Sequence, residues 1–292
     1  MRYILENEKI RVEVDSFGAE IKSVRSKENG REYMWNGDKQ YWGRTSPVLF
    51  PFVGSLKNKE YVYEGTHYPM GQHGFARDME HEAESVSDTV IWFALKSSAE
   101  TLEKYPFDFC LRIGYELTGN QVKVMWKVEN PGKETMYFSI GAHPAFNCPV
   151  HGEPDRNGYG IYFGGVNEIH HHGNTLDTGL AVKEDLVLPL KDGLTDITPD
   201  FFDRCTYMIE GNQTGEVALV DPEGSHYVTV KFDTPLFAIW SPEKKNAPFV
   251  CIEPWYGRCD GVDFEGTLEE REYTNVLPAG ETFRAEYTMI FD

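Results

Sequence analysis

A regular alternation of apolar and polar residues near the middle of the chain is the feature that most restricts its fold. Between residues 121 and 129, the apolar side chains of Val122, Val124, Trp126 and Val128 alternate with Lys, Met, Lys and Glu. This period of two is expected for a β-strand that buries one face. Thr-Gly-Asn before the strand and Asn-Pro-Gly after it connect it to apolar runs at 107–117 and 136–140. We therefore predict an antiparallel meander with tight turns.

Strand signals dominate the rest of the chain as well. Residues 283–291 alternate in the same way, and further strands are predicted at 10–14, 90–95, 227–232 and 237–240. Helical signals are short, at 98–104, which begins with Ser98 and ends before a proline, and in a charged turn at 267–271.

No linker or internal repeat divides the chain. Residues 150–200 are rich in Gly, His and Asp, which indicates long loops over one end of a sheet. The predicted fold class is all-β, with few short helices, and residues 1–292 are expected to form one large antiparallel β-sandwich domain.

The charge balance excludes some classes of partner. With 47 acidic and 28 basic residues the net charge is −19, which argues against nucleic acid and against an anionic membrane. The net charge does not exclude a small anionic substrate, because salt screens exposed charges beyond about 8 Å. Arginines close to the site would therefore determine whether an anion binds. Five cysteines without CxxC spacing predict buried free thiols rather than a zinc or disulfide framework. No apolar run reaches ~18 residues, so we expect a soluble, cytoplasmic protein.

Three polar residues at strand ends form the candidate site. His143 lies where the apolar strand in residues 138–147 breaks into a Pro/Asn turn, so its imidazole can lie at a pocket mouth. His73, between two glycine-containing turns, and Glu253, in the strand Phe-Val-Cys-Ile-Glu-Pro-Trp, are its expected partners. Two histidines and a glutamate make an acid/base set that needs no metal and no cofactor, which predicts proton-transfer chemistry.

Each of these residues also has a purely structural interpretation. Glu253 could be a base with a raised pKa, or it could pair with Arg258 or Lys244. His143 could be a core histidine with satisfied hydrogen bonds, and His73 a loop residue without a role.

Cationic and aromatic residues offer binding groups. Arg44 and Arg77 could hold sugar hydroxyls or a phosphate, or could form ordinary salt bridges. Trp240 and Trp255 could stack on a sugar face or pack in the core. The run of three histidines at 170–172 lacks the geometry of a metal site, and we expect it in a solvated loop.

Four blocks in this order resemble the aldose 1-epimerase (galactose mutarotase) family, and especially its LacX-like branch. They are Arg-Thr-Ser-Pro-Val-Leu-Phe-Pro at 44–51, Met-Gly-Gln-His-Gly-Phe-Ala-Arg at 70–77, Gly-Ala-His-Pro-Ala-Phe at 141–146 and Cys-Ile-Glu-Pro-Trp-Tyr-Gly at 251–257. The resemblance runs nearly end to end. It implies a galactose mutarotase-like supersandwich with an open cleft on one sheet face.

The resemblance also implies roles for individual residues. His143 would be the general acid at the ring oxygen and Glu253 the base at the C1 hydroxyl, while His73 and Arg44 would hydrogen-bond the sugar. The family uses an aspartate to hold hydroxyls, for which Asp203 is the first candidate and Asp233 the second.

The substrate and the class of function keep alternatives. The block at 70–77 also resembles the hexose-6-phosphate mutarotase branch, in which arginines at the positions of Arg44 and Arg77 bind phosphate. We predict a cofactor-independent mutarotase acting on a free hexose, as a monomer or homodimer. The alternatives are a hexose-6-phosphate mutarotase, a non-catalytic carbohydrate-binding module, and a glycoside hydrolase, which would usually need two carboxylates.

Overall fold

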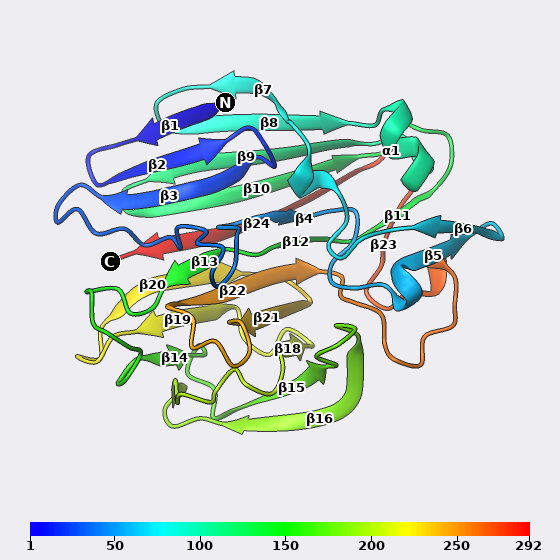
Figure 1. The fold of residues 1–292 in the computed structure, drawn as a ribbon. Helices are drawn as coiled ribbons and strands as arrows, with labels where there is room; N and C mark the ends of the chain where they lie inside the picture. The colour runs from blue at the N-terminus through cyan, green and yellow to red at the C-terminus, as the bar shows by residue number, and fades with distance from the viewer.

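Two large sheets dominate a computed structural model of the chain, which describes residues 1–292 (Figure 1). Every pairing between strands is antiparallel. The nine-stranded sheet has the order β17 (Leu194–Asp196), β14 (Gly160–Tyr162), β19 (Glu216–Val220), β20 (His226–Phe232), β24 (Thr282–Phe291), β10 (Gln121–Glu129), β9 (Cys110–Thr118), β8 (Val90–Lys96) and β7 (Glu82–Val86).

The second sheet carries the site. Its eight strands are β16 (Ala181–Pro189), β15 (Glu168–Asn174), β18 (Tyr207–Glu210), β21 (Leu236–Trp240), β22 (Phe249–Tyr256), β12 (Ile140–Ala142) and β4 (Val48–Leu49) in order, with β13 (Ala145–Asn147) paired beside β22. Smaller sheets are β1 (Arg2–Glu6), β2 (Ile10–Asp15) and β3 (Glu20–Ser26); β5 (Glu60–Tyr63) and β6 (Thr66–Pro69); and β11 (Met136–Phe138) and β23 (Asn275–Leu277).

The all-β prediction is confirmed, and the helices are short. The predicted helix at 98–104 is α1 (Ala99–Lys104), whose N-terminus is capped by the Ser98 side chain. The predicted charged turn is η3 (Leu268–Glu270); η1 (Lys57–Lys59) and η2 (Ala76–Asp78) are further single turns. None of the helices has both the length and the apolar character needed to span a membrane.

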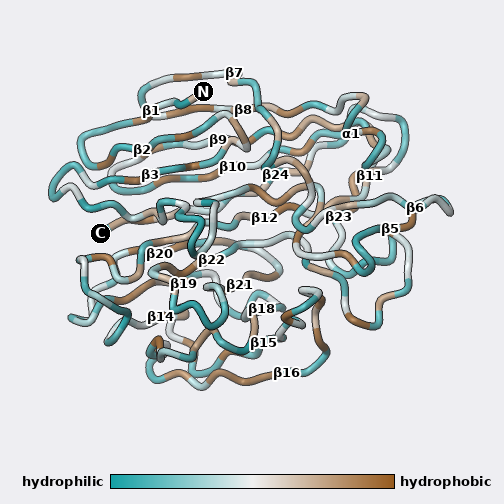
Figure 2. The backbone as a smooth tube through the Cα atoms, in the orientation of Figure 1, coloured by the Kyte–Doolittle hydropathy of each residue, from teal (hydrophilic) through white to brown (hydrophobic).

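Strand alternation builds the core as predicted. In β10 the four apolar side chains at 122, 124, 126 and 128 are buried, while the residues between them are partly exposed. They belong to a cluster of 59 buried apolar residues that includes members of both large sheets. Figure 2 shows the corresponding changes between brown and teal along the strands. This shared core supports the proposal that residues 1–292 form one domain. The five cysteines are buried free thiols, as predicted.

The predicted meander is wrong at its third strand. β9 and β10 pair as expected, but the other neighbour of β10 is β24, and the 136–140 run splits into β11 and β12. The Asn130 amide donates hydrogen bonds to the carbonyls of Glu134 and Leu277, which ties the Asn-Pro-Gly segment to the chain that enters β24. The following residues therefore cross to the other sheet instead of turning back on β10.

The prediction of long loops across residues 150–200 is correct only in part: residues 150–159 and 175–180 lie outside strands, but the region is not loop throughout. Four strands lie there, and the hairpin of β15 and β16 forms one edge of the eight-stranded sheet. The three histidines at 170–172 lie within β15. His171 is buried, and its ring centre lies 4.5 Å from the ring centre of Tyr207. The buried positions of β15 include His171 and Gly173, and β16 is largely exposed, so neither strand shows apolar alternation and the sequence looks like a loop.

The two faces of β22 have different surroundings. Val250 and Ile252 join the main core, whereas Cys251 and Trp255 belong to two separate small clusters. Because side chains alternate along a strand, Glu253 lies on the face of Cys251 and Trp255. The sheet thus presents one face to the core and the other to the candidate site.

A glycine in β12 allows the site wall to pack closely. Gly141 lies opposite Trp255 in the strand register, and a Cβ atom there would lie 2.6 Å from Cδ1 of Trp255.

We expect Gly141→Ala to lower the free energy of unfolding by about 1–3 kcal/mol, since the indole has to move. Denaturant unfolding measures this. Gly71→Ala, with no atom within 4 Å of the added Cβ, is the control and should shift it by less than ~0.5 kcal/mol. Equal stability of both variants would contradict the proposed packing.

Candidate active site

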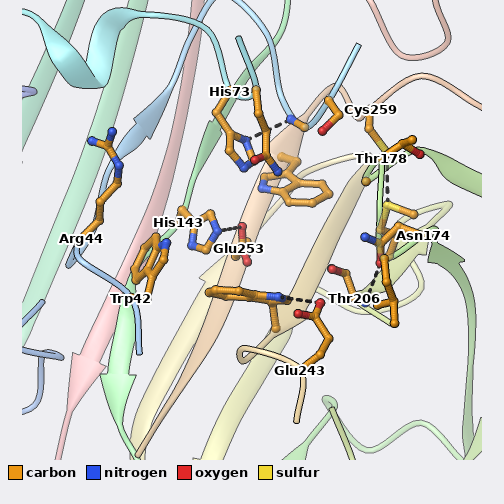
Figure 3. A pocket seen from close by; sticks show the side chains of 18 of the residues that line it. Trp42, Arg44, His73, His143, Asn174, Thr178, Thr206, Glu243, Glu253 and Cys259 are labelled. Atoms are coloured by element: carbon orange, nitrogen blue, oxygen red, sulfur yellow. Dashed lines mark hydrogen bonds and ion pairs between the residues drawn. The ribbon is translucent and has the colours of Figure 1, made fainter. Parts of the chain in front are cut away.

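A cavity of about 440 Å³ lies over the face of β21 and β22 that is turned away from the main core. The predicted site residues that line it include His73, His143, Glu253 and Arg44, which Figure 3 labels. Arg77 and Trp240 line it as well. Its size falls within the range of small-molecule sites, and polar groups from several segments converge on it. Segments far apart in the sequence therefore meet at one pocket.

Glu253 is the buried carboxylate of this pocket. It is 1% exposed, and its Oε2 has no hydrogen-bond partner. Burial raises the pKa of Glu253 well above its ordinary value of 4.5, and the neighbouring Trp255 indole offsets a smaller part of this shift. The structural pairing with Arg258 is not found, because that guanidinium forms ion pairs with Glu210, with Nε 2.6 Å from Oε1, and with Glu272.

His143 follows directly after β12 and faces Glu253. Its Nε2 lies 3.3 Å from Glu253 Oε2, the contact drawn in Figure 3, and the ring stacks on Trp42 at 4.6 Å. Burial, and secondarily the charge of Arg77, lowers the pKa of His143 to about 3, so the imidazole is neutral near pH 7. Because its Nδ1 is buried without a partner, His143 is not a core histidine with satisfied hydrogen bonds.

His73 is held as a hydrogen-bond donor. Its backbone has a positive φ of 66°, and the Gly54 N–H donates to its Nδ1 at 3.0 Å. Burial, followed by the charge of Arg77, lowers the pKa of His73 well below 6.5, so the ring is neutral. Since Nδ1 accepts, the proton of the neutral ring is on Nε2, which is left free to donate.

The two arginines of the pocket share one carboxylate. Arg44 Nη2 donates to Asp78 Oδ1 at 2.7 Å, and Arg77 Nε lies 3.7 Å from Asp78 Oδ2. Arg77 also donates to the Gln72 carbonyl, and burial lowers the pKa of Arg77 to about 10. Asp78 therefore offsets part of the positive charge at this end of the pocket.

Neither candidate aspartate lines the cavity. Asp203 Oδ1 accepts the Lys244 backbone N–H at 2.9 Å, and Asp233 Oδ1 accepts from the Asn212 side chain at 3.1 Å. Besides Glu253, two carboxylates do line it, Asp177 and Glu243, and Glu243 accepts a 3.4 Å hydrogen bond from Trp240 Nε1.

Sequence reasoning missed several lining residues. Trp42 lies two positions before the candidate Arg44, and Glu243 lies three positions after the candidate Trp240. Their closeness in sequence to these candidates could have identified them as lining residues. The polar residues on the opposite side carry no such signal: Asn174, Thr178 and Thr206.

The arrangement can move protons between two oxygens of one ligand. Glu253 and His143 lie 3.3 Å apart and can each give or take a proton, beside the fixed donor His73. Together with Cys251, the side chains of Glu253 and His143 also offer three ligand atoms within 4.8 Å of one another, enough to hold a metal ion.

Comparison with known proteins identifies the family. Residues 1–289 match the model of the aldose 1-epimerase family, so the chain belongs to it. Family and fold together support a mutarotase or epimerase activity, with a sugar as the class of substrate.

The relatives that resemble the chain agree with this assignment. Protein LacX of Lactococcus lactis is 32% identical and covers 94% of both chains. The structure of a galactose mutarotase related enzyme from Lactobacillus acidophilus superimposes with a TM-score of 0.92 at 35% identity, covering 100% of this chain and 97% of that one. The structure of a galactose mutarotase-like protein from Lactobacillus casei superimposes with a TM-score of 0.92 at 29% identity, covering 100% of both chains.

The raised pKa of Glu253 predicts a dependence of stability on pH. The folded state holds this proton more tightly than the unfolded state, so the stabilising effect is complete below pH 4.5 and is lost as pH rises through the folded pKa. We expect Glu253→Gln, which has no charge to bury, to match the wild type near pH 4. Above pH 4.5, the free energy of unfolding of Glu253→Gln should rise relative to that of the wild type by ~1.4 kcal/mol per pH unit, up to the pKa that Glu253 has in the folded state.

Denaturant unfolding of both proteins between pH 4 and 8 measures this difference. The lowered pKa values of His73 and His143 destabilise both proteins as pH falls below 6.5, and subtracting the two curves removes that contribution. A difference that does not change with pH would show that the Glu253 carboxyl titrates normally.

Proposed function

We propose that this protein interconverts the α and β anomers of a free hexose by opening and reclosing the sugar ring. The observation that carries the proposal is the Glu253–His143 pair, two buried groups 3.3 Å apart, each with an unpartnered polar atom, in a cavity of suitable size. A module that only binds sugar has no need of such a pair, because unpartnered buried polar groups cost stability.

The pair can supply the acid and the base from a single proton. The raised pKa of Glu253 and the lowered pKa of His143 both favour a resting state in which the two groups are neutral and the proton is on Glu253. Transfer of that proton to His143 gives a carboxylate, which accepts the proton of the C1 hydroxyl, and an imidazolium, which protonates the ring oxygen as its bond to C1 breaks. The open aldehyde then faces the neutral pair again. Rotation about C1–C2 and the reverse transfers give the other anomer.

The neighbouring groups fit the charge that develops. In this proposal the Nε2–H of His73 donates to the ring oxygen, where charge changes as the ring opens. Trp240 lines the pocket and supplies an aromatic surface, which suits the C–H face of a sugar. An acid and a base each contribute about 10²–10⁴-fold, enough for a reaction that also proceeds in water, so no cofactor is required.

The environment of the arginines favours a free sugar over a sugar phosphate. Arg44 bonds Asp78, and Arg77 bonds the Gln72 carbonyl, so both guanidiniums already have acceptors. A phosphate would also meet the negative charge of Asp78. Exchange NMR on glucose 6-phosphate and free glucose compares the two substrates directly, and faster exchange of the phosphate would reverse this preference.

We expect the protein to accelerate the change in optical rotation of freshly dissolved α-D-glucose and α-D-galactose beyond the spontaneous rate. Glu253→Gln and His143→Asn should each lose about 10²–10⁴-fold of this acceleration, because one proton transfer is removed. His170→Asn, a change to an exposed histidine in β15, is the matched control and should stay fully active. Circular dichroism verifies folding. Full activity of Glu253→Gln would refute the assigned base.

We propose that Glu243 rather than Asp203 holds sugar hydroxyls, since Glu243 lines the cavity and, unlike the other lining carboxylate Asp177, is held against the indole of Trp240. Loss of a hydrogen bond to a charged group costs about 1.5–3 kcal/mol, so Glu243→Gln should raise KM roughly ten- to a hundredfold with kcat little changed. Asp203→Asn should leave KM near the wild-type value. A larger rise of KM in Asp203→Asn would assign the sugar contact to that residue instead.

A further inference from the structure

Cys251 lies directly beside the proposed acid and base. It precedes Glu253 by two positions in β22, so both side chains lie on the same face of the strand. Its sulfur, a His143 ring nitrogen and a Glu253 oxygen all lie within 4.8 Å of one another, and all three residues are buried. Ring opening by the acid and base makes no use of this thiol.

These three atoms match the preferences of a soft divalent cation. Thiolate sulfur, imidazole nitrogen and carboxylate oxygen are the usual ligands of Zn²⁺, with bonds of about 2.0–2.3 Å. Glu253 Oε2 is buried and lacks a hydrogen-bond partner, so it is available as a ligand. Because His143 and Glu253 also line the cavity, a fourth coordination position would face the pocket.

We propose that Zn²⁺ binds to His143, Cys251 and Glu253 and thereby inhibits the enzyme in competition with the sugar. The inhibition rests on the proposed mutarotase function, whereas metal binding does not. A bound cation occupies the lone pairs that the acid and the base need for proton transfer.

Binding has a defined proton balance. The Cys251 thiol must lose its proton to become a ligand, and the proton on Glu253 must leave as well, so both go to the solvent. Burial raises the pKa of the Cys251 thiol well above 9.0, which adds to the cost of forming the thiolate. The affinity for the metal should therefore increase with pH.

A second thiol provides a matched control. Cys259 also lines the cavity and is buried, but its sulfur lies 3.7 Å from Met208 Sδ and has no histidine or carboxylate ligand set around it. Removing this thiol tests whether any cysteine near the pocket is sufficient.

The binding experiment uses the full chain and two metals. Calorimetry measures Zn²⁺ affinity, and Cd²⁺ titration follows the ultraviolet charge-transfer absorption of a cadmium–thiolate bond. The wild type and Cys259→Ser should bind Zn²⁺ and show the cadmium–thiolate absorption. Cys251→Ala and Cys251→Ser should lose this absorption, and their affinity for Zn²⁺ should fall at least tenfold. Even replacing a residue that only supports a metal ligand usually lowers metal affinity by this factor. Absorption that persists in both Cys251 variants, or no binding to the wild type, would overturn the proposal.

The activity experiment separates this proposal from the proposed function. Zn²⁺ should inhibit the wild type and Cys259→Ser, excess sugar should relieve the inhibition, and Mg²⁺, which prefers oxygen ligands, should have no effect. The Cys251 variants should need at least tenfold more Zn²⁺. Equal inhibition of wild type and Cys251→Ala would refute the inhibitory site. A wild type without mutarotase activity that still gives the Cys251-dependent absorption would refute only the function.

Discussion

The burial of one carboxylate is the constraint on which the site depends. Glu253 lies in a strand whose other side chains are apolar, and it is almost fully shielded from water. Desolvation is costly for a charged carboxylate, so the group either holds a proton or gives it to a close acceptor. His143, 3.3 Å away, is such an acceptor. The same burial that makes Glu253 unfavourable for stability therefore makes it a suitable base near neutral pH.

The positive charges of the nearby arginines, like burial, favour the neutral forms of the two histidines. Arg77 lowers the pKa values of both His73 and His143, in addition to the larger effect of burial. Neutral imidazoles can accept a proton or donate one from a fixed nitrogen, whereas a permanent imidazolium could only donate. The arginines thus influence proton transfer through their charge, even though both already have hydrogen-bond acceptors.

Local patterns in the sequence predicted more than long-range pairing could. The alternation in β10 and the Ser98 cap of α1 depend on neighbouring residues, and both were predicted correctly. The pairing of β10 with β24 joins segments about 160 residues apart, and no local pattern encodes it. The hairpin of β15 and β16 was missed because its buried positions include His171 and Gly173 rather than a series of apolar side chains.

The same distinction applies to the site. His143 and Glu253 could be selected because a polar residue interrupts an apolar run, and the structure brings them together. Asp203 had no such context, and its carboxylate instead accepts a backbone N–H outside the cavity. Asn174, Thr178 and Thr206 reach the pocket only through the tertiary arrangement, so single-sequence patterns could not identify them.

The strand register of β22 couples the chemistry to the stability of the whole fold. Val250 and Ile252 are fixed in the main core, and the pairing of β22 with β21 sets which residues face the pocket. A shift by one residue would turn Glu253 into the apolar core and bring Ile252 to the pocket. The apolar residues therefore do more than stabilise the sheets: by making that shift unfavourable, they keep the carboxylate on the face where it meets His143.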